Sequence, residues 1–153
     1  MNNVEESIMK QEFLDNESLR IVLRDGIKDL LEGNQFPLNR EGAAGWVSQD
    51  CIWAVSKRFI VSLRETMATV KFKVPRDNSV FLSMLLDLGL IIKAKDDRLI
   101  HKVTVSIKTD NDGVVDNNFT VLRVPMNSLW VDKSKWIQQS GIVEVQYVES
   151  YEQ

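Results

Sequence analysis

The 153-residue sequence predicts an α+β fold built on a winged-helix core, with an additional small β extension toward the carboxyl end. Three observations lead to this prediction: an apolar, glycine-led stretch at residues 36–59, one helical pattern before it, and two helical patterns after it. The resulting order of helix, strand, helix, helix, strand and strand is that of a winged-helix domain. We expect a flexible lead-in at 1–15, the winged-helix-like core at 16–108, the β extension packed on the core at 109–148, and a tail at 149–153.

The central stretch places apolar residues, in imperfect alternation, on both sides of the polar turn Ser48-Gln49-Asp50. Gly42 and Gly45 precede the turn. Glycine frees the backbone of a turn, and aromatic and β-branched residues fit a half-buried pleat. The stretch therefore predicts a β-hairpin or two short paired strands.

Three helices are predicted from apolar residues that recur at spacings of three and four. The first starts near Asn16 or Ser18 and stops at Gly33-Asn34, which tolerate a left-handed cap. The second starts at Ser56 and ends before Pro75, because the residue before a proline is pushed out of the helical region.

The third helix is capped by Asp77 or Asn78 and stops at Gly89. After it come a strand-like segment at 90–95, a tight turn at 96–98 and a strand at 99–107, which together have the form of a wing. A polar loop is predicted at 108–118. It is followed by a strand at 119–124 and by another strand toward the end of the chain. Gly26, inside the first helix, lowers its stability by about 1 kcal/mol relative to alanine, so close packing is expected there.

The composition predicts a soluble, cytoplasmic protein with a real core. Apolar residues make up 44% of the chain and include four tryptophans, and the single cysteine, Cys51, allows no intrachain disulfide. The amino-terminal residues do not resemble a secretory signal, and no apolar run approaches the ~20 residues of a membrane span.

Catalytic motifs are absent from the sequence. His101 is the only histidine, so a histidine triad, a two-histidine metal clamp and an HD-type phosphohydrolase centre are excluded for this chain alone. The acidic loop around Gly113 fails as a calcium loop, since Lys108 and Phe119 would occupy two ligand positions. We therefore predict no enzyme, no metal and no cofactor, and expect Cys51 and His101 to be ordinary structural residues.

Charge is unevenly distributed along the chain. Residues 1–56 carry 5 Lys+Arg against 10 Asp+Glu, residues 57–108 carry 11 against 5, and residues 109–153 carry 3 against 7. A basic middle between acidic ends indicates phosphate binding if the fold gathers those side chains on one face. The predicted DNA-binding residues lie at the third helix, the turn before it and the wing: Lys71, Lys73, Arg76, Asn78, Ser79, Ser83, Lys93, Lys95, Arg98 and Lys102.

A protein-docking role is the alternative. A third helix this apolar can be mostly core, and Asp77 and Asp87 would repel phosphate. In that case the aromatic residues expected on the surface would meet another protein of the machinery or a second copy of the chain. These residues are Trp130, Trp136, and Tyr147 or Tyr151.

The chain also resembles a known family, the carboxy-terminal domain of the conjugative relaxases of integrative elements. The resemblance rests on Phe36-Pro37-Leu38-Asn39-Arg40-Glu41-Gly42-Ala43, Trp53-Ala54-Val55-Ser56 with Phe59, Leu88-Gly89-Leu90, and Val124-Pro125-Met126-Asn127-Ser128-Leu129-Trp130. Two positions depart from the family pattern: Gly45-Trp46-Val47 stands where a histidine is usual, and Lys57 replaces a proline.

The resemblance implies an accessory, non-catalytic DNA-binding or DNA-positioning domain of a bacterial mobile-element protein. In such proteins the relaxase chemistry resides in a separate HD-type domain, which these residues do not contain. The helicase label of the family is not carried over, since the sequence contains no ATP-binding motif.

Overall fold

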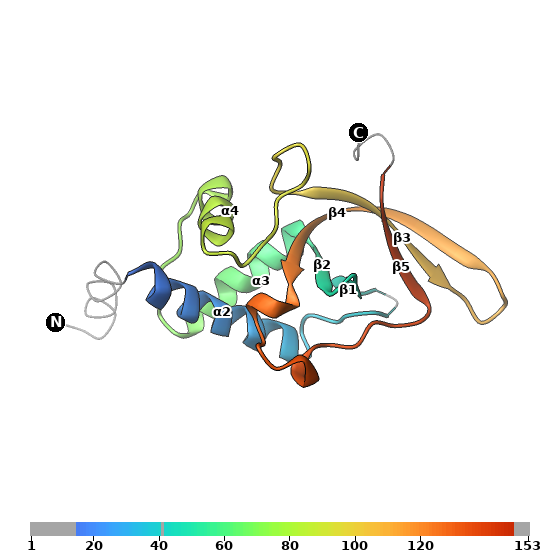
Figure 1. Ribbon diagram of the computed structural model, residues 1–153, viewed down its shortest axis with the longest axis horizontal. Helices are drawn as coiled ribbons and strands as arrows, with labels where there is room; N and C mark the ends of the chain where they lie inside the picture. The colour runs from blue at the N-terminus through green and yellow to red at the C-terminus, as the bar shows by residue number, and fades with distance from the viewer. Residues whose placement is uncertain (1–14, 41, 149–153) are drawn as a thin grey trace.

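The computed structural model describes residues 15–40 and 42–148, which form three α-helices and one five-stranded antiparallel sheet (Figure 1). The helices are α2 (Asn16–Glu32), α3 (Ser56–Thr69) and α4 (Asn78–Asp87). The strands are β1 (Gly45–Ser48), β2 (Cys51–Val55), β3 (His101–Lys108), β4 (Val114–Pro125) and β5 (Val143–Tyr147). The predicted tail, and the predicted lead-in apart from Asp15, lie outside the described residues.

The helix boundaries follow from local capping. The Asp15 carboxylate accepts the backbone N–H of Ser18 at 2.8 Å at the start of α2, and the Asp77 carboxylate accepts that of Val80 at 3.1 Å at the start of α4. The N–H of Gly33 bonds to the carbonyl of Asp29 at 3.1 Å where α2 ends. Each bond satisfies a backbone group that a helix end leaves without an intrahelical partner. The three helices are confirmed.

The central stretch forms the predicted hairpin. Strands β1 and β2 pair in register with Trp46 opposite Trp53, and the turn between them consists of Gln49 and Asp50. Both turn residues have positive φ, 54° and 60°, as a tight two-residue hairpin turn requires.

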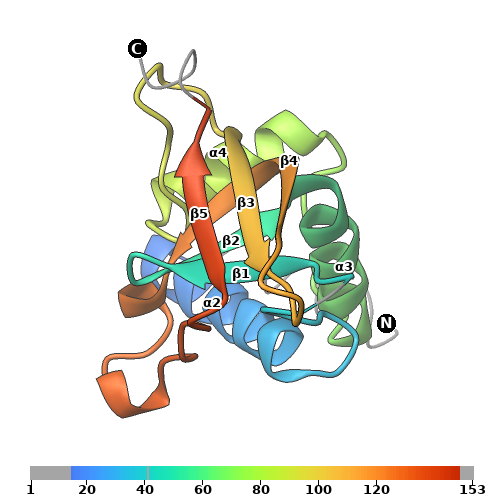
Figure 2. The ribbon, with the colours of Figure 1, turned by 90° about the vertical axis from the view of Figure 1, so that its right-hand side faces the viewer.

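The sheet has the strand order β1-β2-β4-β3-β5. Strand β4 is its longest member, pairing with β2 through Val121–Pro125 and with β3 through Val114–Val121. The sheet curls strongly, so that β1 and β2 cross behind β3 and β5 at a steep angle (Figure 2), and β1 comes back into contact with β5. The result is a half-barrel with the helices on its outer face.

Side chains of the two faces of the sheet form two separate cores. The larger core lies between the outer face and the helices and includes Leu23, Phe59, Leu63, Phe81 and Leu122. The smaller core fills the concave face and consists of Trp46, Cys51, Trp53, Val103, Val105, Val121, Val143 and Val145. In β1, β2 and the second half of β4, alternate residues serve one core or the other, as the pleat dictates, whereas β3 and β5 contribute to the smaller core only.

The winged-helix prediction is wrong. Its wing would pair residues 90–95 with the strand that follows, but that segment contributes only an isolated bridge between Ile92 and Arg123. Strand β3 pairs instead with β4 on one side and β5 on the other. The residues expected to form the small β extension packed on the core therefore supply an inner strand and an edge strand of the only sheet in the described chain. Alternation in residues 101–107 indicates which side chains share a face, but it does not specify the partner strand.

Helix α2 packs closely on α3 at Gly26, as expected from the sequence. A Cβ at this position would meet the Sδ atom of the buried Met67, and Leu63 lies within van der Waals reach. No helix in the described part of the chain is long and apolar enough to span a bilayer.

Candidate functional site

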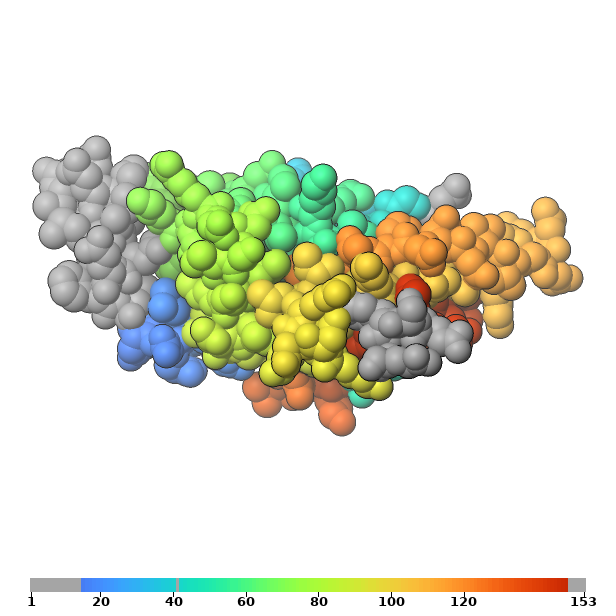
Figure 3. Space-filling view, turned by 90° about the horizontal axis from the view of Figure 1, so that it is seen from above, coloured from blue at the N-terminus to red at the C-terminus, as the bar shows by residue number. Residues whose placement is uncertain are grey.

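The ten residues predicted to bind DNA lie on α4, on the connections before and after it, and at the start of β3. Lys71, Lys73 and Arg76 lie in the connection before α4, and Lys93, Lys95 and Arg98 lie in the loop after it. The remaining four are Asn78, Ser79 and Ser83 on α4 itself and Lys102 at the start of β3. Figure 3 shows α4 and the loop of residues 92–98 side by side on one face of the molecule.

We call the seven cations of this surface the basic face: Lys71, Lys73, Arg76, Lys93, Lys95, Arg98 and Lys102. All seven side chains are exposed. Residues 71–102 contain these seven cations and four acids, a net charge of +3, so the rest of the chain carries −6. Seven of the eleven cations of the basic middle of the sequence are therefore exposed on α4's neighbouring connections and at the start of β3.

Arg64 fixes the start of α4. Its guanidinium donates to the carbonyl of Pro75 at 2.6 Å, to the carbonyl of Arg76 at 3.0 Å and to Oδ1 of Asn78 at 2.8 Å. It also lies over the ring of Phe81, with Cζ 5.0 Å from the ring centroid. The Asn78 oxygen is thus already engaged inside the fold, whereas Ser79 and Ser83 are exposed.

The loop after α4 is held by backbone hydrogen bonds. The N–H of Ala94 bonds to the carbonyl of Arg98 at 2.8 Å, and the N–H of Ile92 bonds to the carbonyl of Arg123 at 2.9 Å. Two cations of this loop face acids: Lys93 Nζ is 3.0 Å from Asp97, and Arg98 Nε is 3.0 Å from Asp96. Exposed pairs of this kind are weak, so these cations remain available to a phosphate that displaces the acid.

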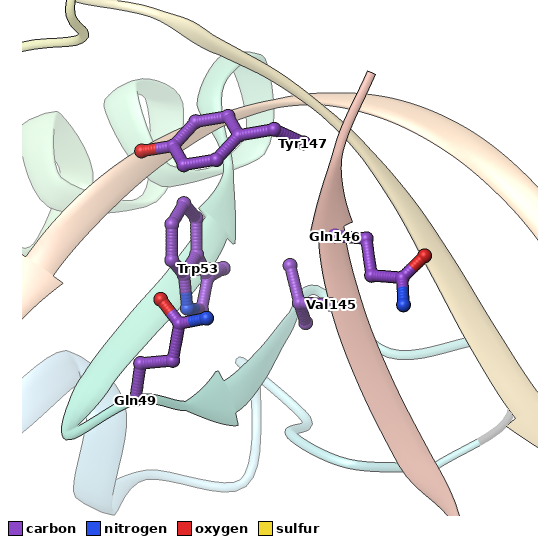
Figure 4. Close-up of a pocket in the computed structure, with 5 residues that line it drawn as sticks. All are labelled: Gln49, Trp53, Val145, Gln146 and Tyr147. Atoms are coloured by element: carbon purple, nitrogen blue, oxygen red, sulfur yellow. The ribbon is translucent and has the colours of Figure 1, made fainter. Parts of the chain in front are cut away.

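A second group of side chains lies at one end of the concave core, and of its members only Tyr147 was expected at a functional surface. Gln49, Trp53, Val145, Gln146 and Tyr147 line a hollow of about 260 Å³ (Figure 4). The Arg123 guanidinium lies over the Trp53 ring, 4.9 Å from its centroid, and the indole N–H of Trp53 donates to the carbonyl of Ser48 at 3.0 Å. No sequence motif could reveal this cluster, because its members come from different strands and the turn between two of them.

His101 is buried behind this hollow and is neutral. Its Nε2 lies 2.7 Å from the carbonyl of Ile92, and its Nδ1 lies 3.0 Å from the hydroxyl of Tyr147. A carbonyl can only accept, so Nε2 carries the proton and Nδ1 accepts from the tyrosine. Burial lowers the pKa of His101, and the bond to Ile92 only partly offsets this effect.

Arg123 and Cys51 form the other part of the cluster. Arg123 Nε donates to Cys51 Sγ at 3.2 Å. Burial acts to lower the pKa of Arg123, but its bond to Cys51 and its proximity to Tyr147 outweigh burial and raise the pKa, so the guanidinium stays charged. Both ring nitrogens of His101 and the Nε of Arg123 are engaged within the fold, which indicates a structural role for this cluster.

Among the described residues, no three His, Cys, Asp or Glu side chains gather closely enough to hold a metal ion. Cys51 is buried, as expected. Of the aromatic residues expected on a docking surface, Trp130 is buried, and its carbonyl accepts the indole N–H of the half-buried Trp136 at 2.9 Å. Tyr147 is half-buried, and Tyr151 lies outside the described residues.

Comparison with known proteins places the chain in a family. The model of the TraI_2 family, described as "Putative helicase", matches residues 12–100, more than half of the sequence. The chain belongs to the TraI_2 family. It is therefore a domain of a family related to conjugal transfer, which agrees in part with the resemblance seen in the sequence.

The fold has a counterpart of known structure. The chain is similar to the crystal structure of the C-terminal domain of the Salmonella enterica protein STY4665, of the family DUF1528, with a TM-score of 0.56 and 10% sequence identity. The match covers 87% of this chain and 100% of that chain. At this identity the likeness concerns the fold alone. No curated protein matches the sequence.

Proposed function

We propose that this domain is a non-catalytic DNA-binding module of a conjugal-transfer protein and that it contacts DNA phosphates through the basic face. The observation that carries the proposal is the charge distribution. Residues 71–102, which include α4 and the segments on either side of it, carry seven exposed cations and a net charge of +3, while the remainder of the chain carries −6. Exposed Lys and Arg side chains that cluster on one surface of an otherwise acidic protein favour a polyanion at that surface.

The geometry favours phosphate contacts over reading of bases. In a winged helix the third helix would enter the major groove, but that architecture is absent here, and the Asn78 side chain is held by Arg64. Lysines on loops contact phosphate oxygens without specifying sequence. We therefore expect weak sequence preference and a steep dependence of affinity on salt.

The test is the fluorescence anisotropy of labelled duplex and single-stranded DNA, titrated with the protein between roughly 50 and 200 mM salt. Each phosphate contact contributes about 0.9 to the slope of log affinity against log salt for a duplex. The double variant Lys95→Gln with Lys102→Gln removes two cations of the basic face. It should lower the slope by about 2 and weaken binding to every sequence alike.

A matched control is the double variant Lys108→Gln with Lys135→Gln, which removes the same charge from exposed positions outside the basic face. It should bind DNA nearly as the unmodified protein does. If both double variants lose the same affinity for DNA, the DNA is attracted by the overall charge of the protein and not by the basic face. No binding at about 50 mM salt would overturn the proposal.

A further inference from the structure

Strand β4 has one open side along its first half. Strand β3 pairs with it from Val114 to Val121, but β2 covers its other side only from Val121 onward. Residues 114–120 therefore form an edge, and in Figure 1 this part of the β3–β4 hairpin extends beyond the helices. Six of the seven side chains are exposed, including Val114 at 59% and Val115 at 48%.

The backbone groups that face the open side can be identified from two hydrogen bonds farther along β4. The carbonyl of Arg123 accepts from Ile92 on the β3 side, and the N–H of Met126 donates to Asp50 on the β2 side. Successive residues of a strand direct their N–H and C=O to alternate sides. The even-numbered residues Asp116, Asn118 and Thr120 thus direct their backbone groups toward the open side.

This edge has few of the features that usually prevent strand pairing, and Asp116 is its only charged side chain. Natural edges are protected by lysine, proline, bulges or covering segments. Residues 114–120, Val-Val-Asp-Asn-Asn-Phe-Thr, contain neither lysine nor proline, and their pairing with β3 continues without a bulge. An edge that is continuous, seven residues long and partly apolar is suited to accept another strand.

We propose that two copies of this chain pair antiparallel along residues 114–120 of β4, around a two-fold axis that passes beside Asn117. The midpoint of the open segment is Asn117, so this register pairs all seven residues of one copy with all seven of the other. It places Asp116 of one copy opposite Asn118 of the other, and Val115 opposite Phe119. A two-fold interface requires such self-complementarity.

Neighbouring registers are less favourable. In an antiparallel pair, a residue whose backbone groups point toward the partner strand must lie opposite another such residue. The possible registers therefore differ by steps that move the two-fold axis by one residue. An axis beside Asp116 would put the two Asp116 carboxylates opposite each other, and like charges in directly opposite positions are destabilising. An axis beside Asn118 would avoid this but leave Val114 unpaired within the open segment.

The concave side of this edge offers room for the second copy. Val115, Asn117 and Phe119 line a hollow of about 570 Å³ together with Trp46 and Ile142. Ile142 is also partly exposed. In the proposed register Phe119 of each copy lies opposite Val115 of the other, and pairs of an aromatic with a β-branched residue stabilise adjacent strands. The self-association is independent of DNA binding.

The first test is a cysteine cross-link under mild oxidation, read on a non-reducing gel. Asn117 lies beside the axis, and its backbone N–H and C=O groups point away from the open side. It therefore forms a non-hydrogen-bonded pair with Asn117 of the other copy, with Cα atoms about 4.5 Å apart. This distance permits a disulfide. Asn117→Cys should give a covalent dimer at least tenfold faster than Asp116→Cys or Asn118→Cys. The native Cys51 is buried and does not compete.

The second test uses charge, with the dissociation constant measured by analytical ultracentrifugation. Asn118→Asp places a second carboxylate opposite Asp116 of the other copy, twice per dimer, and should weaken association roughly two- to thirtyfold. The double variant Asn118→Asp with Asp116→Asn exchanges the two side chains and should restore the association. Cross-linking at equal rates from all three cysteine positions, a protein that remains monomeric, or no rescue by the exchange would overturn the proposal.

Discussion

The Tyr147 hydroxyl donates to Nδ1 of His101 across 3.0 Å, while Nε2 of the same ring donates to the carbonyl of Ile92 at 2.7 Å. One neutral, buried imidazole thereby joins the loop after α4 and β3, which follow each other in sequence, to the distant strand β5. That loop carries three of the cations of the basic face. The histidine that looked unremarkable in the sequence therefore holds part of the proposed DNA surface in place.

Stability should fall on mild acidification because of His101. Its pKa in the folded protein is lowered by burial, so below the ordinary value of 6.5 the unfolded chain binds a proton that the folded chain does not. The nearby charges of Arg123 and Asp96 act on this pKa in opposite senses. We expect the free energy of unfolding, measured in urea, to decrease between about pH 7.5 and pH 5.5.

His101→Gln is the control for this prediction. The variant should be less stable than the unmodified protein at about pH 7.5, but its stability should change less over the same range. Asp15 and Asp132 have lowered pKa values, so their contribution is lost only as pH falls through and below their ordinary value of 3.8, outside this window. Parallel pH profiles of the two proteins would contradict the assignment.

Trp46 and Trp53 provide a matched comparison of a satisfied and an unsatisfied indole. They are cross-strand partners, 2% and 1% exposed, but Trp53 Nε1 bonds to Ser48 whereas Trp46 Nε1 has no partner among the described residues. Trp53→Phe should therefore be more destabilising than Trp46→Phe, by about 1–3 kcal/mol. Urea unfolding followed by far-UV circular dichroism measures the difference. Equal losses would mean that Trp46 finds a partner in solution.

Arg64 should be intolerant of lysine. A lysine ammonium cannot reproduce the planar fork that reaches Pro75, Arg76 and Asn78 at once. We expect Arg64→Lys to lower the free energy of unfolding by about 1–3 kcal/mol.

Arg58 on the same helix provides the control for Arg64. Its bonds to Gly42 and Gln35 are long, 3.5 and 3.4 Å, so Arg58→Lys should be nearly neutral. If both lysine variants lose equal stability in urea, the contacts of Arg64 are not the cause.

Gly26→Ala should be destabilising even though alanine favours a helix by about 1 kcal/mol. The new methyl would meet the buried Met67 side chain, and overpacking of a core costs about 1–3 kcal/mol. We expect a net loss in urea unfolding. In a Met67→Ala background the same substitution should become neutral or stabilising, because the obstructing atoms are gone. An unchanged effect in that background would contradict the packing explanation.

Parts of the candidate site were accessible from the sequence. The uneven distribution of charge located the basic middle, and Asp77 and Gly89 marked the ends of α4, so the positions of the ten predicted residues around that helix follow from local signals. The engagement of Asn78 by Arg64 and the cluster around His101 do not follow from local signals, because they depend on side chains brought together from separate elements. The ion pairs of Lys93 and Arg98 join residues of one loop.

The sequence alone determined the elements whose cause is local: three helices set by apolar periodicity, with side-chain caps at the starts of α2 and α4, and the β1–β2 hairpin set by its turn. Tertiary structure alone decided how the strands pair. Residues 114–118 read as a polar loop because Asp and Asn disfavour strands, yet pairing with β3 extends β4 through them. A strand's alternation specifies its faces but not its neighbours, since backbone hydrogen bonds are the same for every partner, and only mutual burial selects among them.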